Sequence, residues 1–146
     1  MSGAERRSGQ CLCGAVRVSA EVTGSGIQAC HCHDCQRWTG GGPFLVVGVR
    51  DVVITGVERV ADYRHSSWGE RGSCATCGSP VYWRLQGGEI EGLAIGLFED
   101  QTGWHVTSEI FVDHRPGWLP PWPGAMQATE AEQIAKFDAA LQGETQ

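Results

Sequence analysis

The stretch Cys30-His31-Cys32-His33-Asp34-Cys35 holds three cysteines and two histidines within six residues. Thiolates bind zinc tightly, and Cys-x-x-Cys spacing places the sulfurs of Cys32 and Cys35 about one tetrahedral edge apart. Cys30 supplies a third sulfur next to this pair. We therefore interpret the stretch as a metal-binding loop in which these three cysteines are the ligands.

The other cysteines form two further clusters, Cys11-Leu12-Cys13 and Cys74-Ala75-Thr76-Cys77, so the three clusters account for all seven cysteines of the chain. A structural zinc ion takes four protein ligands, whereas a catalytic zinc ion keeps one position open. Seven thiolates therefore fill one closed site and leave a second site with three. From spacing alone, a ribbon-like site made of the two Cys-x-x-Cys pairs is equally allowed.

Composition argues against a disulfide scaffold, a nucleic-acid-binding protein and a secreted or membrane protein. Seven cysteines in 146 residues are fewer than a disulfide scaffold has, and an odd number would leave one thiol unpaired. A net charge of -6, with no basic run beyond Arg6-Arg7, argues against nucleic-acid binding. The N-terminal residues lack a secretory signal and no window is apolar enough for a membrane span, so we expect a cytoplasmic protein with free thiols, no nucleic acid and no membrane.

Hydrophobic patterning predicts a mainly β protein with one C-terminal surface helix. Residues 1–8 are expected to be a disordered tail, and residues 23–26 a turn. Thr129 and Glu132 form a capping box, with Ile134, Phe137 and Leu141 on one helical face, so a helix is expected over residues 130–142. Residues 36–40 suit a short helical turn. Irregular structure anchored by two tryptophans is expected over 116–124. Short strands are expected over 15–22, 43–49, 52–55, 58–64, 81–84, 90–98 and 106–112.

Several motifs give the chain a resemblance to a known family, that of the glutathione-dependent formaldehyde-activating enzymes, also called the CENP-V/GFA domain. Val18 and Ser73 depart from the aromatic residues common at these positions, and neither is a candidate ligand. The matching motifs are Gly9 to Arg17, Cys30 to Arg37, Tyr63 to Ser67 with Glu70-Arg71-Gly72, Cys74 to Pro80, and Ile110 to Val112 followed by Arg115 to Trp118.

The resemblance implies an Mss4-like β-sheet fold with zinc-binding loops and two zinc ions. Residues 9–125 would be the zinc domain, and residues 126–146 the C-terminal helix and tail. It also implies how the cysteines divide: the structural zinc would be bound by Cys11, Cys13, Cys74 and Cys77, and the second, catalytic zinc by Cys30, Cys32 and Cys35.

The reaction that the resemblance implies is carbon-sulfur lyase-type chemistry, in which the thiol of glutathione adds to formaldehyde. A coordinating thiol is ionised, which suits a substrate thiol entering the fourth position of a three-thiolate site. Arg37, Arg71 and Trp83 lie near the cysteine clusters in sequence and are candidate contacts for glutathione, although surface ion pairs or core packing also explain them.

The remaining residues of the loop have open roles. His31 and His33 are candidates for a fourth ligand or a proton carrier, but a role in shaping the loop is the favoured interpretation. Asp34 suits either orienting a ligand or capping a helical turn.

Two other functions compete with glutathione addition. One is a binding module in which both zinc ions are structural and a surface such as residues 118–122 meets a protein or a small thiol. The other is the same chemistry on a different thiol or aldehyde, because fold and metal do not determine the substrate.

Overall fold

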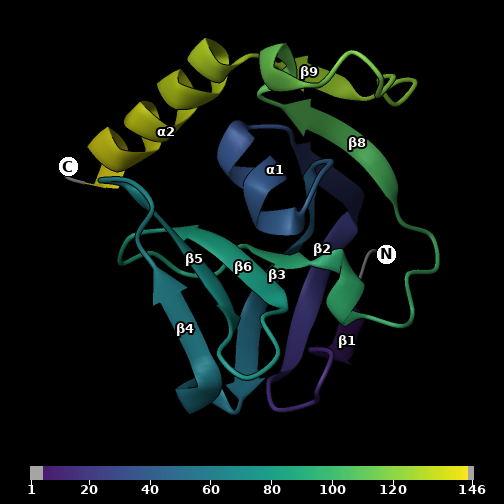
Figure 1. The fold of residues 1–146 in the computed structure, drawn as a ribbon, viewed down its shortest axis with the longest axis vertical. Coiled ribbons are helices and arrows are strands. Elements are labelled where there is room, and N and C mark those ends of the chain that lie inside the picture. Colours follow the sequence, from purple (N-terminus) through teal and green to yellow (C-terminus); the bar gives the residue numbers. More distant parts are fainter. Residues whose placement is uncertain (1–4, 145–146) are drawn as a thin grey trace. The chain divides into compact units, whose positions relative to one another are not determined.

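The computed structural model describes the backbone of residues 5–144 and the side chains of residues 5–140. The described chain divides into two compact units. The first comprises the residues up to Ile27 together with Val46–His105, and the second comprises Gln28–Leu45 together with the residues from Val106 onward. Both units are discontinuous, and strands β2 and β3 run from one into the other (Figure 1).

Most of the strands belong to the first unit. Within it β2 pairs with both β1 and β3, and β7 pairs with β3; β4, β5 and β6 form a separate antiparallel sheet (Figure 1). The pairing of β1 with β2 runs from Glu5 opposite Val22 to Gln10 opposite Arg17. The strands are β1 (Glu5–Gln10), β2 (Arg17–Cys30), β3 (Phe44–Thr55), β4 (Val60–Tyr63), β5 (Gly69–Cys74), β6 (Pro80–Leu85) and β7 (Gly92–Ala94).

The second unit contains both α-helices of the described chain, α1 (His33–Thr39) and α2 (Glu130–Glu144). The end of β2 borders β8 (His105–Ile110), which pairs in parallel with β9 (Met126–Ala128). The core residues Ile110, Phe111 and Ala128 pack against Ile134 of α2 and against the cysteine loop. Neither helix in the described part of the chain has the length and apolar composition needed to cross a membrane.

The alternating pattern at the start of β2 is confirmed. Val16, Val18, Ala20 and Val22 are all buried, while Arg17 between them is exposed. The mainly β class and the C-terminal helix are also confirmed, and the predicted helical turn after the cysteine loop is the helix α1.

Three expectations about local structure were wrong. Residues 5–8 are not a tail but part of β1, because the Arg7 guanidinium donates to two backbone oxygens, of Asp100 and Thr102, and stacks on Trp104. Residues 1–4 lie outside the described residues. β2 runs without a turn through residues 23–26. The strand expected over 90–98 is limited to β7, and a 3-10 helix over Ile95–Leu97 follows it.

The capping box of α2 is present as predicted. The backbone N–H of Thr129 donates to the Glu132 carboxylate (2.8 Å), and the backbone N–H of Glu132 donates to the Thr129 hydroxyl (3.3 Å). Ile134 and Phe137 are half-buried on the inner face of the helix, while the side chain of Leu141 lies outside the described residues. The helix therefore begins where the sequence pattern placed it.

Close packing in the smaller sheet makes Gly72 a test of the fold. A Cβ atom at Gly72 would lie 2.4 Å from the ring of Tyr82, its cross-strand partner, whereas one at Gly96 would meet nothing within 4 Å. We expect Gly72→Ala to lower the free energy of unfolding by about 1–3 kcal/mol, and Gly96→Ala by less than about 0.5 kcal/mol. Urea denaturation measures both, and equal effects would contradict the packing described here.

The capping box also predicts a pH dependence. Hydrogen bonds from the backbone N–H and then the hydroxyl of Thr129 lower the pKa of Glu132 below its ordinary value of 4.5. A lowered folded-state pKa stabilises the protein above the unfolded-state pKa, and this stabilisation is lost as the pH falls through the folded-state value. We expect the wild type to exceed Glu132→Gln in stability at neutral pH, with the difference shrinking as the pH falls below 4.5. Glu89→Gln, at an exposed position, is the control and should show no such trend.

Candidate metal centres

The first cluster of sulfurs lies in the first unit and joins two loops. Cys11 and Cys13 follow β1 in a tight turn that Gly14 closes with φ of 80°. Cys74 ends β5, and Cys77 lies in the turn before β6. Gly78 has φ of 81°, the left-handed conformation expected after the second sulfur of such a turn.

The geometry of this cluster suits a tetrahedral metal ion. Its four sulfurs lie within 4.8 Å of one another, with Cys13 Sγ 3.7 Å from Cys11 Sγ and 3.8 Å from Cys74 Sγ. A tetrahedron with metal–sulfur bonds of about 2.3 Å has edges of about 3.8 Å. The four cysteines are therefore placed as a closed zinc site requires.

The thiols of this cluster differ widely in acidity. Hydrogen bonds from the Ser79 hydroxyl and backbone N–H lower the pKa of Cys77 to about 5. The backbone N–H of Ala15 lowers the pKa of Cys13, but desolvation and proton sharing with the neighbouring sulfurs outweigh it and raise that pKa to about 11. The neighbouring sulfurs thus compete for protons when no cation lies between them. A divalent cation would replace the shared protons.

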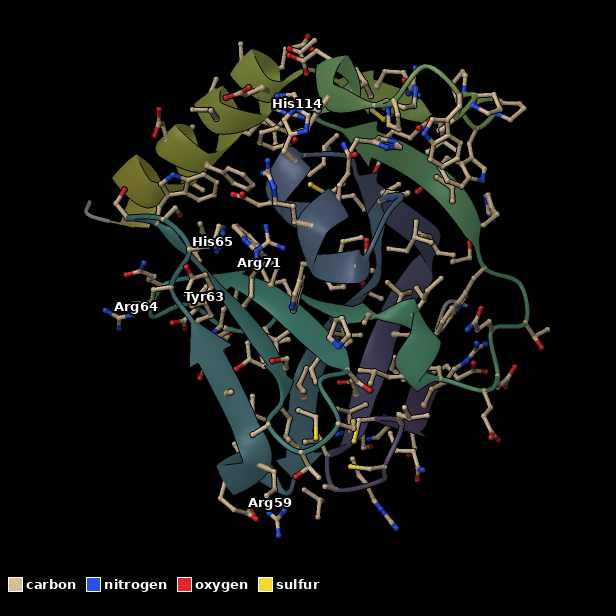
Figure 2. The ribbon with its side chains drawn as sticks, in the orientation of Figure 1. Arg59, Tyr63, Arg64, His65, Arg71 and His114 are labelled. Carbon is tan, nitrogen blue, oxygen red and sulfur yellow. The ribbon has the colours of Figure 1, made fainter. Side chains whose placement is uncertain are left out.

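Neighbouring residues hold the two loops in place. The backbone N–H of Leu12 donates to the Ser79 hydroxyl at 3.0 Å, which joins one cysteine turn to the other. Arg59, labelled in Figure 2 at the end of β4 away from Tyr63, donates to Thr76 at 3.1 Å, and its carbonyl accepts from Ala75 at 2.7 Å. The turns are therefore fixed by hydrogen bonds in addition to any metal.

The second cluster lies in the second unit, where β2 meets α1. Cys30 ends β2, Cys32 is the N-cap of α1 and Cys35 lies in its first turn, and the three sulfurs lie within 4.8 Å of one another. Cys32 Sγ accepts the backbone N–H of Cys35 at 3.3 Å. The cap of this helix is thus a cysteine, and Asp34 is an exposed residue inside the first turn.

Charge also favours a cation at the second cluster. Hydrogen bonding with the sulfurs of Cys32 and then Cys35, together with burial, raises the pKa of Cys30 far above its ordinary value of 9.0. Three adjacent thiolates are therefore unfavourable unless a positive charge lies between them. Cys30 and Cys32 pack against the apolar core of the unit, and this packing limits the access of water to their inner side. The cluster provides three ligands for a metal ion.

Neither histidine of the loop belongs to the three-sulfur cluster. The His31 ring is completely buried, and its Nε2 lies 2.8 Å from an oxygen of Glu109. His33 is exposed, and its ring stacks at 4.6 Å on that of His114 (Figure 2 labels His114). The structure therefore supports the interpretation that both residues shape the loop.

Glu109 is the residue of this region that the sequence analysis did not identify. It is completely buried in β8 and accepts hydrogen bonds from four groups. The donors are His31, Arg115, the backbone of Trp122 and Gln127. The available signal was a single carboxylate in an otherwise uncharged strand, which by itself does not reveal burial.

The three candidate substrate contacts are divided between the units. Arg71 and Trp83 are cross-strand partners in the first unit, on β5 and β6, and Arg71 is buried. Trp83 Nε1 donates to His65 Nε2 at 3.2 Å, and the Trp68 and Trp83 rings meet edge to face. Arg37 is exposed at the end of α1 in the second unit. Figure 2 labels Arg71 and His65.

A third group with ligand-type side chains is explained by helix capping. Asp113, His114 and Glu130 lie close together at the start of α2. Asp113 accepts the backbone N–H of Glu130 at 2.9 Å, and Glu130 bonds to His114 at 2.7 Å. These contacts satisfy the end of the helix without a metal ion.

Comparison with known proteins identifies the family. A family described as "Glutathione-dependent formaldehyde-activating enzyme" matches residues 6–114. A Schizosaccharomyces pombe protein, named an uncharacterized lyase, is 30% identical over 110 residues, which are 74% of this chain and 80% of that protein. The crystal structure of a Rhodobacter sphaeroides protein matches with a TM-score of 0.55 and 21% identity, covering 84% of this chain and 99% of that one, and thus shares the fold. The chain belongs to the glutathione-dependent formaldehyde-activating enzyme family.

Proposed function

We propose that this protein is a zinc enzyme that adds a thiol, glutathione in the first instance, to formaldehyde or another small aldehyde. The observation that carries the proposal is the unequal size of the two sulfur clusters, one with four cysteines and one with three. Four thiolates complete a tetrahedral zinc site, whereas three leave a position for a substrate. The family match supports the same chemistry.

The reaction needs no oxidant or other reactant. The thiol sulfur forms a bond to the aldehyde carbon, the C=O π pair moves to oxygen, and that oxygen takes up the proton that leaves the sulfur. Glutathione and formaldehyde would thus give S-hydroxymethylglutathione. A zinc ion at the three-cysteine cluster, when bound, supplies the positive charge that ionises the incoming thiol.

The residues of the chain prepare the site for this addition. Cys30, Cys32 and Cys35 gather three negative sulfurs, which would weaken the metal as a Lewis acid and favour activating the thiol over polarising the aldehyde. The N–H of Cys35 stabilises negative charge on Cys32. Cys30 and Cys32 also pack against the apolar core of the unit.

Arg71 and Trp83 in the first unit, and Arg37 in the second, are each candidates for recognising glutathione, and Arg71 is the first to test. Arg71 is only 5% exposed, and its buried guanidinium suits a carboxylate of glutathione. The aromatic group of His65, Trp68 and Trp83 offers an apolar surface for the rest of the substrate.

Two alternatives remain in view. Trp118 and Met126 are each 72% exposed in the second unit, which would suit a binding module that presents an apolar surface to a partner. Trp118 therefore does not anchor its loop, contrary to expectation.

A different thiol or aldehyde would use the same cysteines. A cytoplasmic location, where thiols stay reduced, is part of the proposal.

The metal content of the protein tests the assignment of both cysteine clusters. We expect two zinc ions per chain by elemental analysis, and one in a Cys32→Ser variant that remains folded. Cys74→Ser should lose the other ion and most of its folded population, because a structural zinc site contributes about 10–16 kcal/mol of apparent binding free energy. Two ions retained in both variants would contradict the assignment of the clusters.

The reaction itself can be followed by exchange NMR on glutathione and labelled formaldehyde. We expect the wild type to accelerate interconversion with the adduct above the uncatalysed background, and Cys32→Ser to lose the acceleration, because only the three-cysteine cluster leaves a position for the thiol. No acceleration by a protein that holds both zinc ions would refute glutathione addition and favour one of the alternatives.

The same assay tests whether Arg71 recognises glutathione, by comparing glutathione with 2-mercaptoethanol. Arg71→Met should raise KM for glutathione by about ten- to a hundredfold, as expected for a lost hydrogen bond to a charged group. It should leave 2-mercaptoethanol, which has no carboxylate, unaffected. Arg50→Met, at an exposed arginine of β3, is the matched control. Equal effects on both thiols would remove Arg71 from substrate recognition.

A further inference from the structure

The carboxylate of Glu109 is fully enclosed by hydrogen-bond donors. One oxygen accepts from His31 Nε2 (2.8 Å) and Arg115 Nη1 (3.1 Å). The other accepts from the backbone N–H of Trp122 (2.9 Å) and from Gln127 Nε2 (2.7 Å). Burial raises the pKa of Glu109, but the donors, Gln127 and His31 foremost, outweigh this and hold the pKa below its usual value. A charge buried this completely requires such partners.

One of these donors lies inside the three-cysteine loop. His31 separates Cys30 from Cys32, and its residue is 0% exposed. Because an ionised carboxylate only accepts hydrogen bonds, the His31 proton is assigned to Nε2. The ring is therefore oriented by Glu109.

The backbone of His31 is held as well. Its N–H donates to the carbonyl of Ile110 at 3.0 Å, and its carbonyl accepts from Gln36 Nε2 at 2.7 Å. The same Gln36 amide donates to the carbonyl of His114 at 3.0 Å. The ring and the N–H are thus attached to neighbouring residues of β8, and the carbonyl to Gln36 of α1, so the residue between two sulfur ligands has little freedom to rotate.

We propose that Glu109 is a positioning residue for the three-cysteine site, acting through His31 to set Cys30 and Cys32 for metal binding before the ion arrives. Partners that orient metal ligands change metal affinity by about 10–100-fold when they are removed. The proposal rests on metal binding at this cluster and is independent of which thiol or aldehyde the protein uses. Its alternative is that the network only stabilises the second unit.

The test measures cadmium affinity at each site of the whole chain. ¹¹³Cd NMR resolves a four-sulfur from a three-sulfur site, and competition with a chelator gives the two affinities. In Glu109→Gln, an NH₂ group replaces one of the two carboxylate oxygens. In either orientation it faces another hydrogen-bond donor, the backbone N–H of Trp122 or the guanidinium of Arg115, and one hydrogen bond of the network is lost. We expect binding at the three-cysteine site to weaken about 10–100-fold, with a shifted resonance, and the four-cysteine site to stay unchanged.

Glu70→Gln is the control for losing a buried carboxylate. Glu70 is 5% exposed in the first unit and pairs with Arg84 at 2.6 Å, so this variant should leave the three-cysteine affinity unchanged. A folded Glu109→Gln variant with wild-type cadmium affinity would overturn the proposal. Equal weakening of both sites would overturn it too, because that result indicates general destabilisation.

A milder variant keeps the proposal testable if Glu109→Gln does not fold. Gln127 is exposed, and Gln127→Ala removes one donor from Glu109 without touching the cysteine loop. We expect this variant to weaken the three-cysteine site about two- to tenfold. Gln101→Ala, which removes an amide that donates to the backbone of residues 95 and 98, is the matched control. Equal affinities for the two variants would overturn the proposal.

Discussion

Like-charged sulfurs held close together are the constraint on which this structure depends. Seven thiols are gathered into two groups, and within each group the sulfurs are near enough to repel one another when ionised. The raised pKa values of Cys13 and Cys30, to which the neighbouring sulfurs contribute, express this conflict. A cation would resolve it, and we therefore expect metal binding to stabilise the fold as well as to supply the proposed chemistry.

Different structural elements hold the sulfurs of the two groups close together. The four-cysteine group joins the ends of β1 and β5 through tight turns whose hydrogen bonds tie one loop to the other. The three-cysteine group uses a strand end and a helix N-terminus, with an apolar core on its inner side. The first group offers four sulfurs, as a closed metal site requires, whereas the second offers three. This difference is why we propose that the reaction takes place at the second group.

Glu109 shows how a buried charge can serve a site without touching it. A carboxylate without solvent is costly unless each of its oxygens is satisfied, and here both oxygens have two donors. The donors come from three separate segments, which include the cysteine loop and the proline-rich segment around Trp122. These hydrogen bonds therefore link the placement of the cysteine loop to that of the other segments.

The sequence by itself determined the features that depend on local pattern. The cysteine spacing indicated metal sites, the alternation from Val16 to Val22 indicated a strand, and the Thr129–Glu132 box located the start of the last helix. Each of these rests on contacts within a few residues, or on side chains whose chemistry has few other uses. The motifs also sufficed for the family, which the comparisons then established.

Only the tertiary structure decided what depends on residues far apart in the chain. Spacing allowed two divisions of the cysteines, and the folded loops group Cys11 and Cys13 with Cys74 and Cys77. The polar residues 5–8 resembled a tail because their partners, such as Asp100, are distant in sequence. Glu109 looked like an ordinary strand carboxylate because burial and hydrogen bonding to His31, 78 residues away, leave no local signature. Long-range contacts settle these points, and no window of sequence contains both partners.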